Sequence, residues 1–306
     1  MSLARSFITW LSEQRPITRA IGATGMRLGF ARRFIAGETI EEALAAAAAL
    51  NANGMSVILN MLGEHVTDRA SAEVSFAAYQ RMLAEIAARN MNASITVKPT
   101  QLGLSIAPDL CFTLTRRLVA DAAARGNFLE IDMEDSPTVD ATLALFESIK
   151  REHENVGLAV QAYLFRTEAD LRRLMPLRPK IRLVKGAYLE PHDVAFASKQ
   201  DVDKNFAALM RLLFAEGFMP AVGSHDEAMI AEAKRLAREH GRAPDDWEVQ
   251  MLHGIRRDLQ EQLVRQGYRM RVYVTFGTEW VPYFMRRLAE RPANVGFVVR
   301  SLLRGR

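Results

Sequence analysis

The sequence predicts an α/β fold, a closed (β/α)8 barrel, on three observations. Short and mostly apolar runs recur eight times along the 306 residues, and longer amphipathic segments lie between them. The centres of successive runs are about 24–38 residues apart, which is the length of one strand and one helix. Parallel strands buried on both faces are short and apolar in this way. An open, doubly wound sheet is the alternative architecture.

The expected elements follow one another without a linker. The apolar runs expected as strands are Met55–Leu59, Ala93–Val97, Phe128–Ile131, Val156–Ala162, Ile181–Val184, Pro220–Val222, Trp247–Met251 and Arg271–Thr275. The amphipathic segments expected as helices include Ser71–Asn90, Ala107–Arg125, Thr138–Glu152, Asp201–Glu216, Asp226–Glu239 and Asp258–Gln266. A further helix begins after Thr39, because Glu42 three residues later completes a capping box.

Composition excludes several classes of protein. Hydrophobic residues make up 49% and charged residues 25%, as in ordinary globular proteins. The net charge of +4 is too weak a field to favour nucleic-acid binding. The single cysteine, Cys111, excludes an intrachain disulfide and a zinc site of several thiolates, so we expect a reducing compartment. No apolar run reaches the roughly 18–20 residues that span a bilayer.

The N-terminal region differs from the rest of the chain. Its first 33 residues contain several arginines and one acid, Glu13. A transit peptide, a basic amphipathic helix on a membrane surface, and a helical arm packed on the barrel would all look like this. We favour the arm, and expect residues 1–36 to form it and residues 37–306 to form a single catalytic barrel.

Polar residues follow nearly every expected strand. In a (β/α)8 barrel the C-terminal strand ends form the active-site face. The residues found there are Asn60, Glu64, Lys98, Asp132, Gln161, Lys185, Gly186, Ser224, His225, His253 and Tyr273. The loops at the other ends, such as 125–127, contain only turn residues. So many polar strand ends together predict an enzyme site.

Several chemistries remain open for that site. Lys98 or Lys185 at a strand end could form the Schiff base of an aldolase or lyase, and Lys185 beside Gly186 could bind an anion. His225 and His253 end neighbouring strands, but no metal-binding motif is present and we expect no metal. Gly-rich Rossmann and P-loop motifs do not occur.

The C-terminal segment is the most specific feature. Trp280 to Glu290 reads as a helix that directly follows the last strand. Tyr283, Arg286, Arg287 and Glu290 share one face at i, i+3, i+4 and i+7. If this helix closes over the barrel mouth, the two arginines form a fork for a small carboxylate.

At these residues the sequence resembles the proline dehydrogenase family, in its short monofunctional bacterial form. The resemblance runs from about Gly37 to Leu303. It rests on Leu59-Asn60-Met61-Leu62-Gly63-Glu64, Arg182-Leu183-Val184-Lys185-Gly186-Ala187-Tyr188, Leu252-His253-Gly254, Arg271-Val272-Tyr273-Val274 and Arg286-Arg287-Leu288-Ala289-Glu290-Arg291-Pro292. It implies a distorted (β/α)8 barrel, resembling triosephosphate isomerase, whose last helix lies over the strand C-terminal ends.

The resemblance also implies an activity. Family members oxidise L-proline to Δ1-pyrroline-5-carboxylate by hydride transfer to N5 of non-covalent FAD, and pass the electrons to a membrane quinone. This is the first step of proline degradation to glutamate. A separate pyrroline-5-carboxylate dehydrogenase would take the product. We therefore expect a cytoplasmic protein with a peripheral contact at the inner face of the membrane. A hydroxyproline-preferring flavin dehydrogenase, a Schiff-base lyase and a scaffold without turnover are the alternatives.

The resemblance assigns roles residue by residue. The residues that match catalytic positions are Asp132 and Arg182. The residues that match substrate-binding positions are Lys98, Arg286, Arg287, Tyr273, Tyr283, Leu252, Ala187 and Glu64. The residues that match flavin-binding positions are Met133, Gln161, Arg182, Lys185, Gly186, Ala187, Ser224 and His225. Two bulky tyrosines, Tyr273 and Tyr283, favour proline over its 4-hydroxy derivative.

Overall fold

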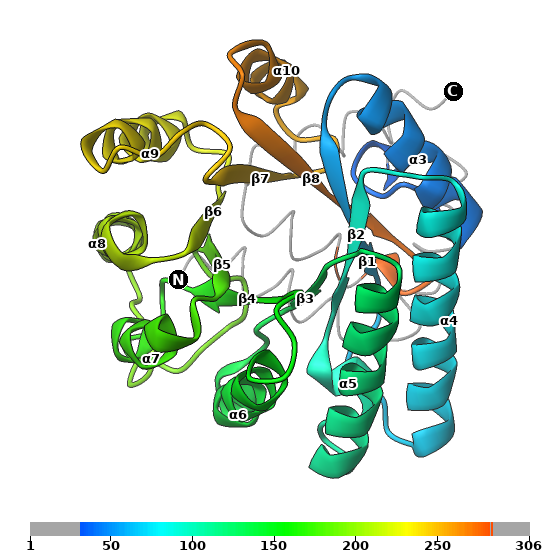
Figure 1. Cartoon of the computed structure of the whole chain (residues 1–306). Helices are drawn as coiled ribbons and strands as arrows, with labels where there is room; N and C mark the ends of the chain where they lie inside the picture. Colours follow the sequence, from blue (N-terminus) through cyan, green and yellow to red (C-terminus); the bar gives the residue numbers. More distant parts are fainter. Residues whose placement is uncertain (1–30, 282, 284–306) are drawn as a thin grey trace, which may run out of the picture.

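Eight parallel strands close into a barrel in the order β1 to β8, with β8 hydrogen-bonded to β1 (Figure 1). The structure is a computed structural model that describes residues 31–281 and 283. The strands are β1 (Ser56–Met61), β2 (Ala93–Val97), β3 (Leu129–Ile131), β4 (Val156–Gln161), β5 (Lys180–Val184), β6 (Met219–Gly223), β7 (Glu248–Leu252) and β8 (Arg269–Phe276). The predicted (β/α)8 barrel is confirmed, and the open sheet is wrong.

Helices ring the barrel on its outside (Figure 1). They are α3 (Ile40–Ala52), α4 (Arg69–Ala88), α5 (Pro108–Ala124), α6 (Val139–Lys150), α7 (Thr167–Leu174), α8 (Lys199–Glu216), α9 (Glu227–Glu239) and α10 (Arg257–Arg265). Short 3-10 helices are η1 (Ala31–Arg33), η2 (Pro99–Leu102), η3 (Ser136–Thr138) and η4 (Met175–Leu177). Helix α7 was not predicted from the sequence, because its eight residues offer too few turns to show an apolar period.

Local sequence signals explain where the helices begin. The capping box predicted at Thr39 and Glu42 is present at the start of α3. Asp68 caps α4 by accepting from the Ser71 amide at 2.8 Å. Pro108 occupies the first turn of α5, where a missing N–H removes no hydrogen bond. These short-range contacts set the helix ends that frame the loops of the site.

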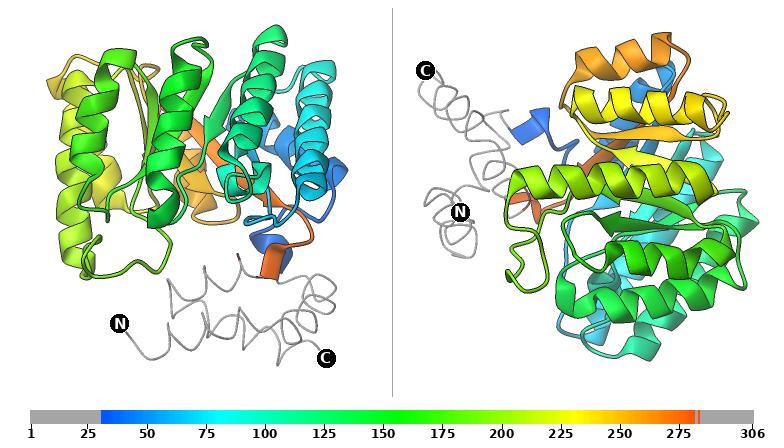
Figure 2. Two further views of the ribbon diagram at one scale, coloured as in Figure 1. Left: turned by 90° about the horizontal axis from the view of Figure 1, so that it is seen from below. Right: turned by 90° about the vertical axis from the view of Figure 1, so that its left-hand side faces the viewer.

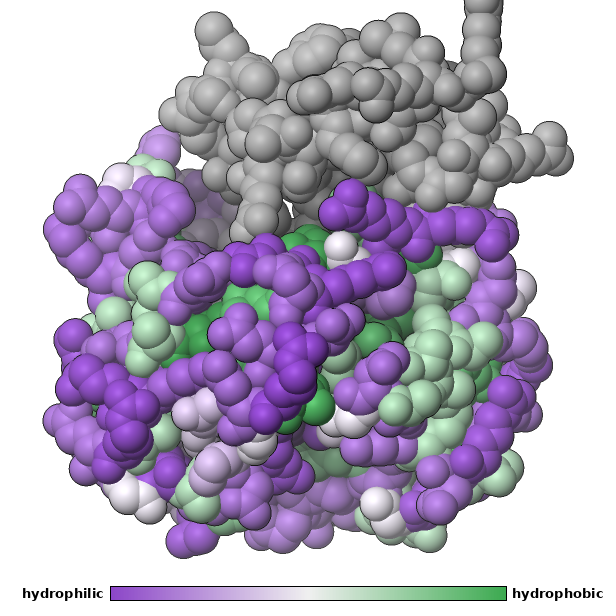
Figure 3. All heavy atoms as spheres, turned by 90° about the horizontal axis from the view of Figure 1, so that it is seen from above, coloured by the Kyte–Doolittle hydropathy of each residue, from purple (hydrophilic) through white to green (hydrophobic). Residues whose placement is uncertain are grey.

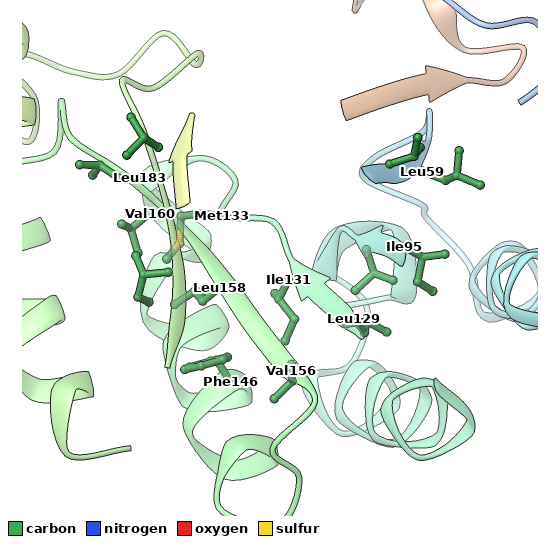
Figure 4. Packing of buried hydrophobic residues seen from close by; sticks show 14 of the residues in the cluster. Leu59, Ile95, Leu129, Ile131, Met133, Phe146, Val156, Leu158, Val160 and Leu183 are labelled. Atoms are coloured by element: carbon green, nitrogen blue, oxygen red, sulfur yellow. The ribbon is translucent and has the colours of Figure 1, made fainter. Parts of the chain in front are cut away.

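The apolar core lies between the strands and the helices. Figure 4 shows part of it, where Ile131 and Leu158 on neighbouring strands and Phe146 on α6 lie between the sheet and the helices. All three side chains are 0% exposed. The face drawn in Figure 3 is mostly hydrophilic, and its most hydrophobic residues show in recesses of the surface. Across residues 31–281 and 283, no helix has the length and apolar character that a bilayer span needs.

Two expectations lie largely outside the described residues. Most of the N-terminal arm is residues 1–30, and its boundary at residue 36 stays a prediction. The arginines of the C-terminal helix, Arg286 and Arg287, also lie outside the described chain, as does Glu290. Of that predicted helix the structure describes Trp280, Val281 and Tyr283, whose side chains are buried.

Candidate active site

Charged side chains, rather than apolar ones, occupy the barrel interior near the N-terminal ends of the strands. Glu248 on β7 is 1% exposed, and its carboxylate lies 2.8 Å from Lys180 Nζ and 3.0 Å from Arg271 Nε. Lys180 belongs to β5, which does not neighbour β7, so their contact crosses the interior. Burial by itself would raise the pKa of Glu248, but the charges of Arg271 and Lys180 outweigh it and hold that pKa well below its usual range.

Arg182 on β5 lies in the next layer toward the strand C-terminal ends. Its Nε is 2.9 Å from Oε1 of Glu130, and its Nη2 contacts Asp132 Oδ1. The Glu130 contact is an ion pair without hydrogen-bond alignment. The guanidinium carbon also lies 4.9 Å from the centre of the Tyr273 ring. The carboxylates of Glu130 on β3 and of Asp132 just after it, with one aromatic ring on β8, thus fix the orientation of this buried cation.

Asp132 is held by three donors. Its Oδ1 accepts from the Thr96 hydroxyl at 2.9 Å and from Arg182, and its Oδ2 accepts from the Tyr273 hydroxyl at 2.7 Å. These donors come from three different strands. With both carboxylate oxygens engaged, Asp132 is suited to positioning Arg182 and Tyr273.

Lys98 follows β2 and lies at the rim of the same region. Its side chain is 8% exposed, and its Nζ is 4.0 Å from Glu64 Oε2. Glu134, buried nearby, accepts from both the hydroxyl and the amide of Thr100 at 2.6 and 2.8 Å. Burial raises the pKa of Glu134, while Thr100 and then Lys98 oppose the shift. The short helix η2 after Lys98 is thereby tied to the end of β3.

One cavity of about 640 Å³ unites the predicted residues. Its lining includes Lys98, Asp132, Met133, Gln161, Arg182, Lys185, Gly186, Ala187, Ser224, His225, Leu252, Tyr273 and Tyr283. Among the described residues to which the family resemblance gives a role, only Glu64 does not line it, and His253, predicted at the end of its strand, does not line it either. Glu64 lines an adjoining cavity of about 680 Å³, which shares Lys98 and Tyr283 with the first. The structure brings together residues that are far apart in the sequence.

The loop after β5 shapes one part of the cavity. Gly186 has φ +112, and a Cβ there would lie 2.3 Å from the Tyr163 ring, so glycine allows this ring to lie on the backbone. Lys185 Nζ pairs with Asp203 and, at 3.3 Å, with Asp226. Its Nζ is thus engaged by two carboxylates, which argues against Lys185 as the nucleophile of a Schiff base.

His225 has a defined hydrogen-bonding role. Its Nε2 accepts from the backbone amide of Leu252 at 2.9 Å. This nitrogen is therefore already used, which argues against a metal site shared with His253. Burial, with a smaller contribution from Arg257, lowers the pKa of His253 to about 4.

Sequence reasoning missed several residues of this interior. Glu130 and Gln250 contact Arg182 from inside the barrel, and Phe34 lines the cavity from the N-terminal side. A signal for the first two was present, since Glu130–Asp132 and Glu248–Gln250 are polar pairs two residues apart on short apolar strands. That spacing places both members on one face of a strand. No local signal identifies Phe34.

Comparison with known proteins agrees with this geometry. A sequence profile described as proline dehydrogenase matches residues 43–300. The chain belongs to the proline dehydrogenase family. This confirms the family that the sequence motifs indicated, a family of oxidoreductases.

Individual relatives show how far the likeness extends. The chain is 39% identical to proline dehydrogenase 1 of Bacillus subtilis (strain 168), over 99% of this chain and 100% of that protein. It is 43% identical to the proline dehydrogenase of Deinococcus radiodurans, over 90% of each. It is 28% identical to the bifunctional protein PutA of Escherichia coli (strain K12), over 94% of this chain and 26% of PutA.

Solved structures support the fold. Proline utilization A from Bdellovibrio bacteriovorus, inactivated by N-propargylglycine, matches with a TM-score of 0.80 and 24% identity over 86% of this chain. A Bradyrhizobium japonicum proline utilization A mutant matches with a TM-score of 0.72 and 25% identity over 88% of this chain. The chain spans about a third of those longer proteins, 32% and 31% respectively.

Proposed function

We propose that this chain oxidises L-proline to Δ1-pyrroline-5-carboxylate with non-covalently bound FAD, as the first step of proline degradation. The observation that carries the proposal is the convergence of Arg182, Asp132, Tyr273 and Lys98 on one cavity in a chain of this family. A buried, oriented cation beside aromatic and aliphatic walls suits hydride transfer from a small amino acid. The electrons would pass to a membrane quinone, and the product to a separate pyrroline-5-carboxylate dehydrogenase.

The cavity fits a flavin by its size and by its donors. About 640 Å³ is in the usual range for cofactor sites. Amide, ammonium, hydroxyl and imidazole groups lie along it, from Gln161, Lys185, Ser224 and His225. Gly186 and Ala187 add wall surface without bulk, and Met133 adds a flexible apolar side chain. These residues, with Arg182, would hold FAD, and bound FAD would accept the hydride.

The residues of the chain would orient the substrate and exclude water. Lys98, together with Arg286 and Arg287 from outside the described residues, would bind the carboxylate of proline. Leu252, Tyr273, Tyr283 and Ala187 would surround the ring, and Glu64 would help close the site behind Lys98. Positive charge on Arg182 favours electron density arriving next to it. Proline with a neutral amine loses a hydride from the carbon beside nitrogen and a proton from nitrogen, which leaves the C=N bond of the product.

An absorbance spectrum tests the proposal directly. The purified protein should show a flavin band, and anaerobic L-proline should bleach it, because the two electrons move from substrate to cofactor. D-Proline is the control. If its carboxylate is held in the same site, its ring is turned, and the carbon that loses the hydride is oriented differently toward the flavin. A colourless protein that borohydride and a carbonyl substrate modify at a lysine would instead support the lyase. Bleaching by 4-hydroxyproline with a higher kcat/KM would support the hydroxyproline enzyme.

The proposed location is cytoplasmic, with a peripheral contact at the inner face of the membrane through residues 1–33. Delivery of electrons to a quinone requires such contact, and six arginines against one acid in this region suit an anionic lipid surface. Flotation with anionic liposomes should retain the full chain and lose a chain lacking residues 1–33. Equal flotation of both would show that residues 1–33 do not provide the membrane contact.

A further inference from the structure

We propose that residues 33–37 are a fixed wall of the cavity, that Phe34 limits the size of the substrate ring, and that Gly254 is the positioning residue that admits this segment. The inference rests on the proposed function for the identity of the substrate. The anchoring of the segment stands on contacts alone.

Hydrogen bonds tie the segment to the end of β8. The Ala36 amide donates to Thr275 O at 2.9 Å, and the Thr275 hydroxyl donates to Phe34 O at 3.2 Å. Two residues further on, the Gly277 amide donates to Gly37 O at 3.0 Å. Figure 2 shows these two parts of the described chain, in blue and orange, at the same end of the barrel. The segment is therefore held by hydrogen bonds against the C-terminal end of β8 and the residues that follow it.

Two adjacent side chains of the segment, Phe34 and Ile35, have different surroundings. Ile35 is 0% exposed and so belongs to the packed interior. Phe34, one residue earlier, lines the cavity with Leu252, Ile255 and Tyr273. Leu252 is the last residue of β7, and Tyr273 lies in β8. Both are expected around the substrate ring. Phe34 thus adds an aromatic wall at the substrate end of the cavity.

Gly254 is required by the backbone of this segment. A Cβ on Gly254 would lie 1.6 Å from Arg33 O and 2.8 Å from Arg33 C. Because these are backbone atoms, no side-chain rotation relieves the overlap. Gly254 belongs to the Leu252-His253-Gly254 motif. The close approach of the Arg33 backbone explains why glycine is needed there, without reference to substrate or cofactor.

A matched control glycine, Gly267, lies between α10 and β8. Gly267 has φ +82, close to the +74 of Gly254, but a Cβ there would meet nothing within 4 Å. Alanine strains the backbone similarly at both positions, because both have positive φ. Only at Gly254 does alanine also collide with Arg33. Comparing Gly254→Ala with Gly267→Ala therefore isolates the displacement of the segment from ordinary glycine strain.

Hydrogen exchange tests the anchoring without reference to activity. In Gly254→Ala we expect the amides of Ala36 and Gly277 to exchange at least tenfold faster than in the wild type. The full-length protein is labelled, quenched and digested, and the peptides are measured by mass spectrometry. In Gly267→Ala they should exchange as in the wild type. Equal exchange in the two variants overturns the anchoring, whatever the substrate of the enzyme is.

Substrate preference tests the role of Phe34. Phe34→Ala opens space, so the ratio of kcat/KM for L-pipecolate, whose ring has one more methylene, to that for L-proline should rise about tenfold. Gly254→Ala should raise the same ratio, and Gly267→Ala should not. The double variant Phe34→Ala with Gly254→Ala should match Phe34→Ala alone, because Gly254 acts through Phe34.

The outcomes separate the two proposals. A wild-type protein that oxidises L-proline, with an unchanged pipecolate ratio in Phe34→Ala, overturns the role of Phe34. A wild-type protein that does not oxidise L-proline overturns the proposed function, while the exchange measurement still decides the anchoring. If Gly254→Ala does not fold, Phe34→Ala alone decides the substrate limit.

Discussion

The hydroxyl of Tyr273 on β8 donates a 2.7 Å hydrogen bond to Oδ2 of Asp132, which follows β3 on the far side of the barrel. Burial raises the pKa of Tyr273, against the smaller effect of Arg182, so the phenol stays a neutral donor at any working pH. Since Asp132 also contacts Arg182, this bond links an expected wall of the substrate site to the buried cation.

Tyr273→Phe should therefore impair the reaction while leaving the cofactor in place. A hydrogen bond to a charged group is worth about 1.5–3 kcal/mol, so kcat/KM for L-proline should fall about 10- to 100-fold. Flavin content, measured as the ratio of flavin to protein absorbance, should be nearly unchanged. Tyr268→Phe, outside the cavity lining, is the matched control. Wild-type kinetics in Tyr273→Phe would remove the bond from the mechanism.

Replacement of the arginines should separate substrate binding from electron acceptance. Arg286→Met or Arg287→Met removes part of the expected carboxylate fork, with a loss of about 1.5–3 kcal/mol and one to two decades in kcat/KM. Arg182→Met should mainly lower kcat, because this cation would act on the flavin. Steady-state kinetics and flavin occupancy of the three variants check this. Near-normal kcat/KM in both C-terminal variants would leave the helix as a lid only.

The sequence predicts the layout of the site better than its interior. Period and spacing locate every strand, because strands buried on both faces are short and apolar. Polar residues at strand ends predict that Lys98, Asp132 and Lys185 converge, since parallel strands end at one face. The contact of Phe34 with Thr275 joins residues 241 positions apart, and no local pattern encodes such a distance.

The charged layer around Glu248 also escapes a search for apolar periodicity. Charged residues can occupy this interior because Lys180 and Arg271 compensate the charge of the buried Glu248 carboxylate. A strand such as Glu248–Leu252 then carries two polar residues facing inward and still packs. Glu64 is placed beside Lys98 rather than in the main cavity, a separation that depends on loop geometry after β1.

Glu248→Gln should destabilise the barrel strongly. It leaves Lys180 and Arg271 without their shared counter-charge, and breaking a buried ion pair costs about 3–5 kcal/mol. Urea denaturation should show that loss in the free energy of unfolding. Glu239→Gln, which removes an exposed partner of Arg235, should cost less than about 1 kcal/mol. Similar losses in the two variants would show that the buried charges are not essential to the fold.

His253 should make the protein acid-sensitive in a defined pH window. Burial, helped by Arg257, lowers the pKa of His253 from 6.5 to about 4. The unfolded chain therefore takes up the proton near pH 6.5, and the folded chain only near pH 4. Between these values the unfolded state binds more protons, so stability falls as the pH falls through the window and levels off outside it.

His253→Asn should abolish this part of the acid sensitivity. One pKa unit corresponds to about 1.4 kcal/mol, so protonation of His253 accounts for at most about 3.5 kcal/mol between pH 6.5 and 4. Urea denaturation at pH 7, 5.5 and 4.5 should give a shallower decline for His253→Asn than for the wild type. His240→Asn, at an exposed position after α9, should retain the wild-type decline. If His253→Asn also retains it, the acid sensitivity lies with other groups, and His253 is protonated in the folded barrel at far less cost than its burial implies.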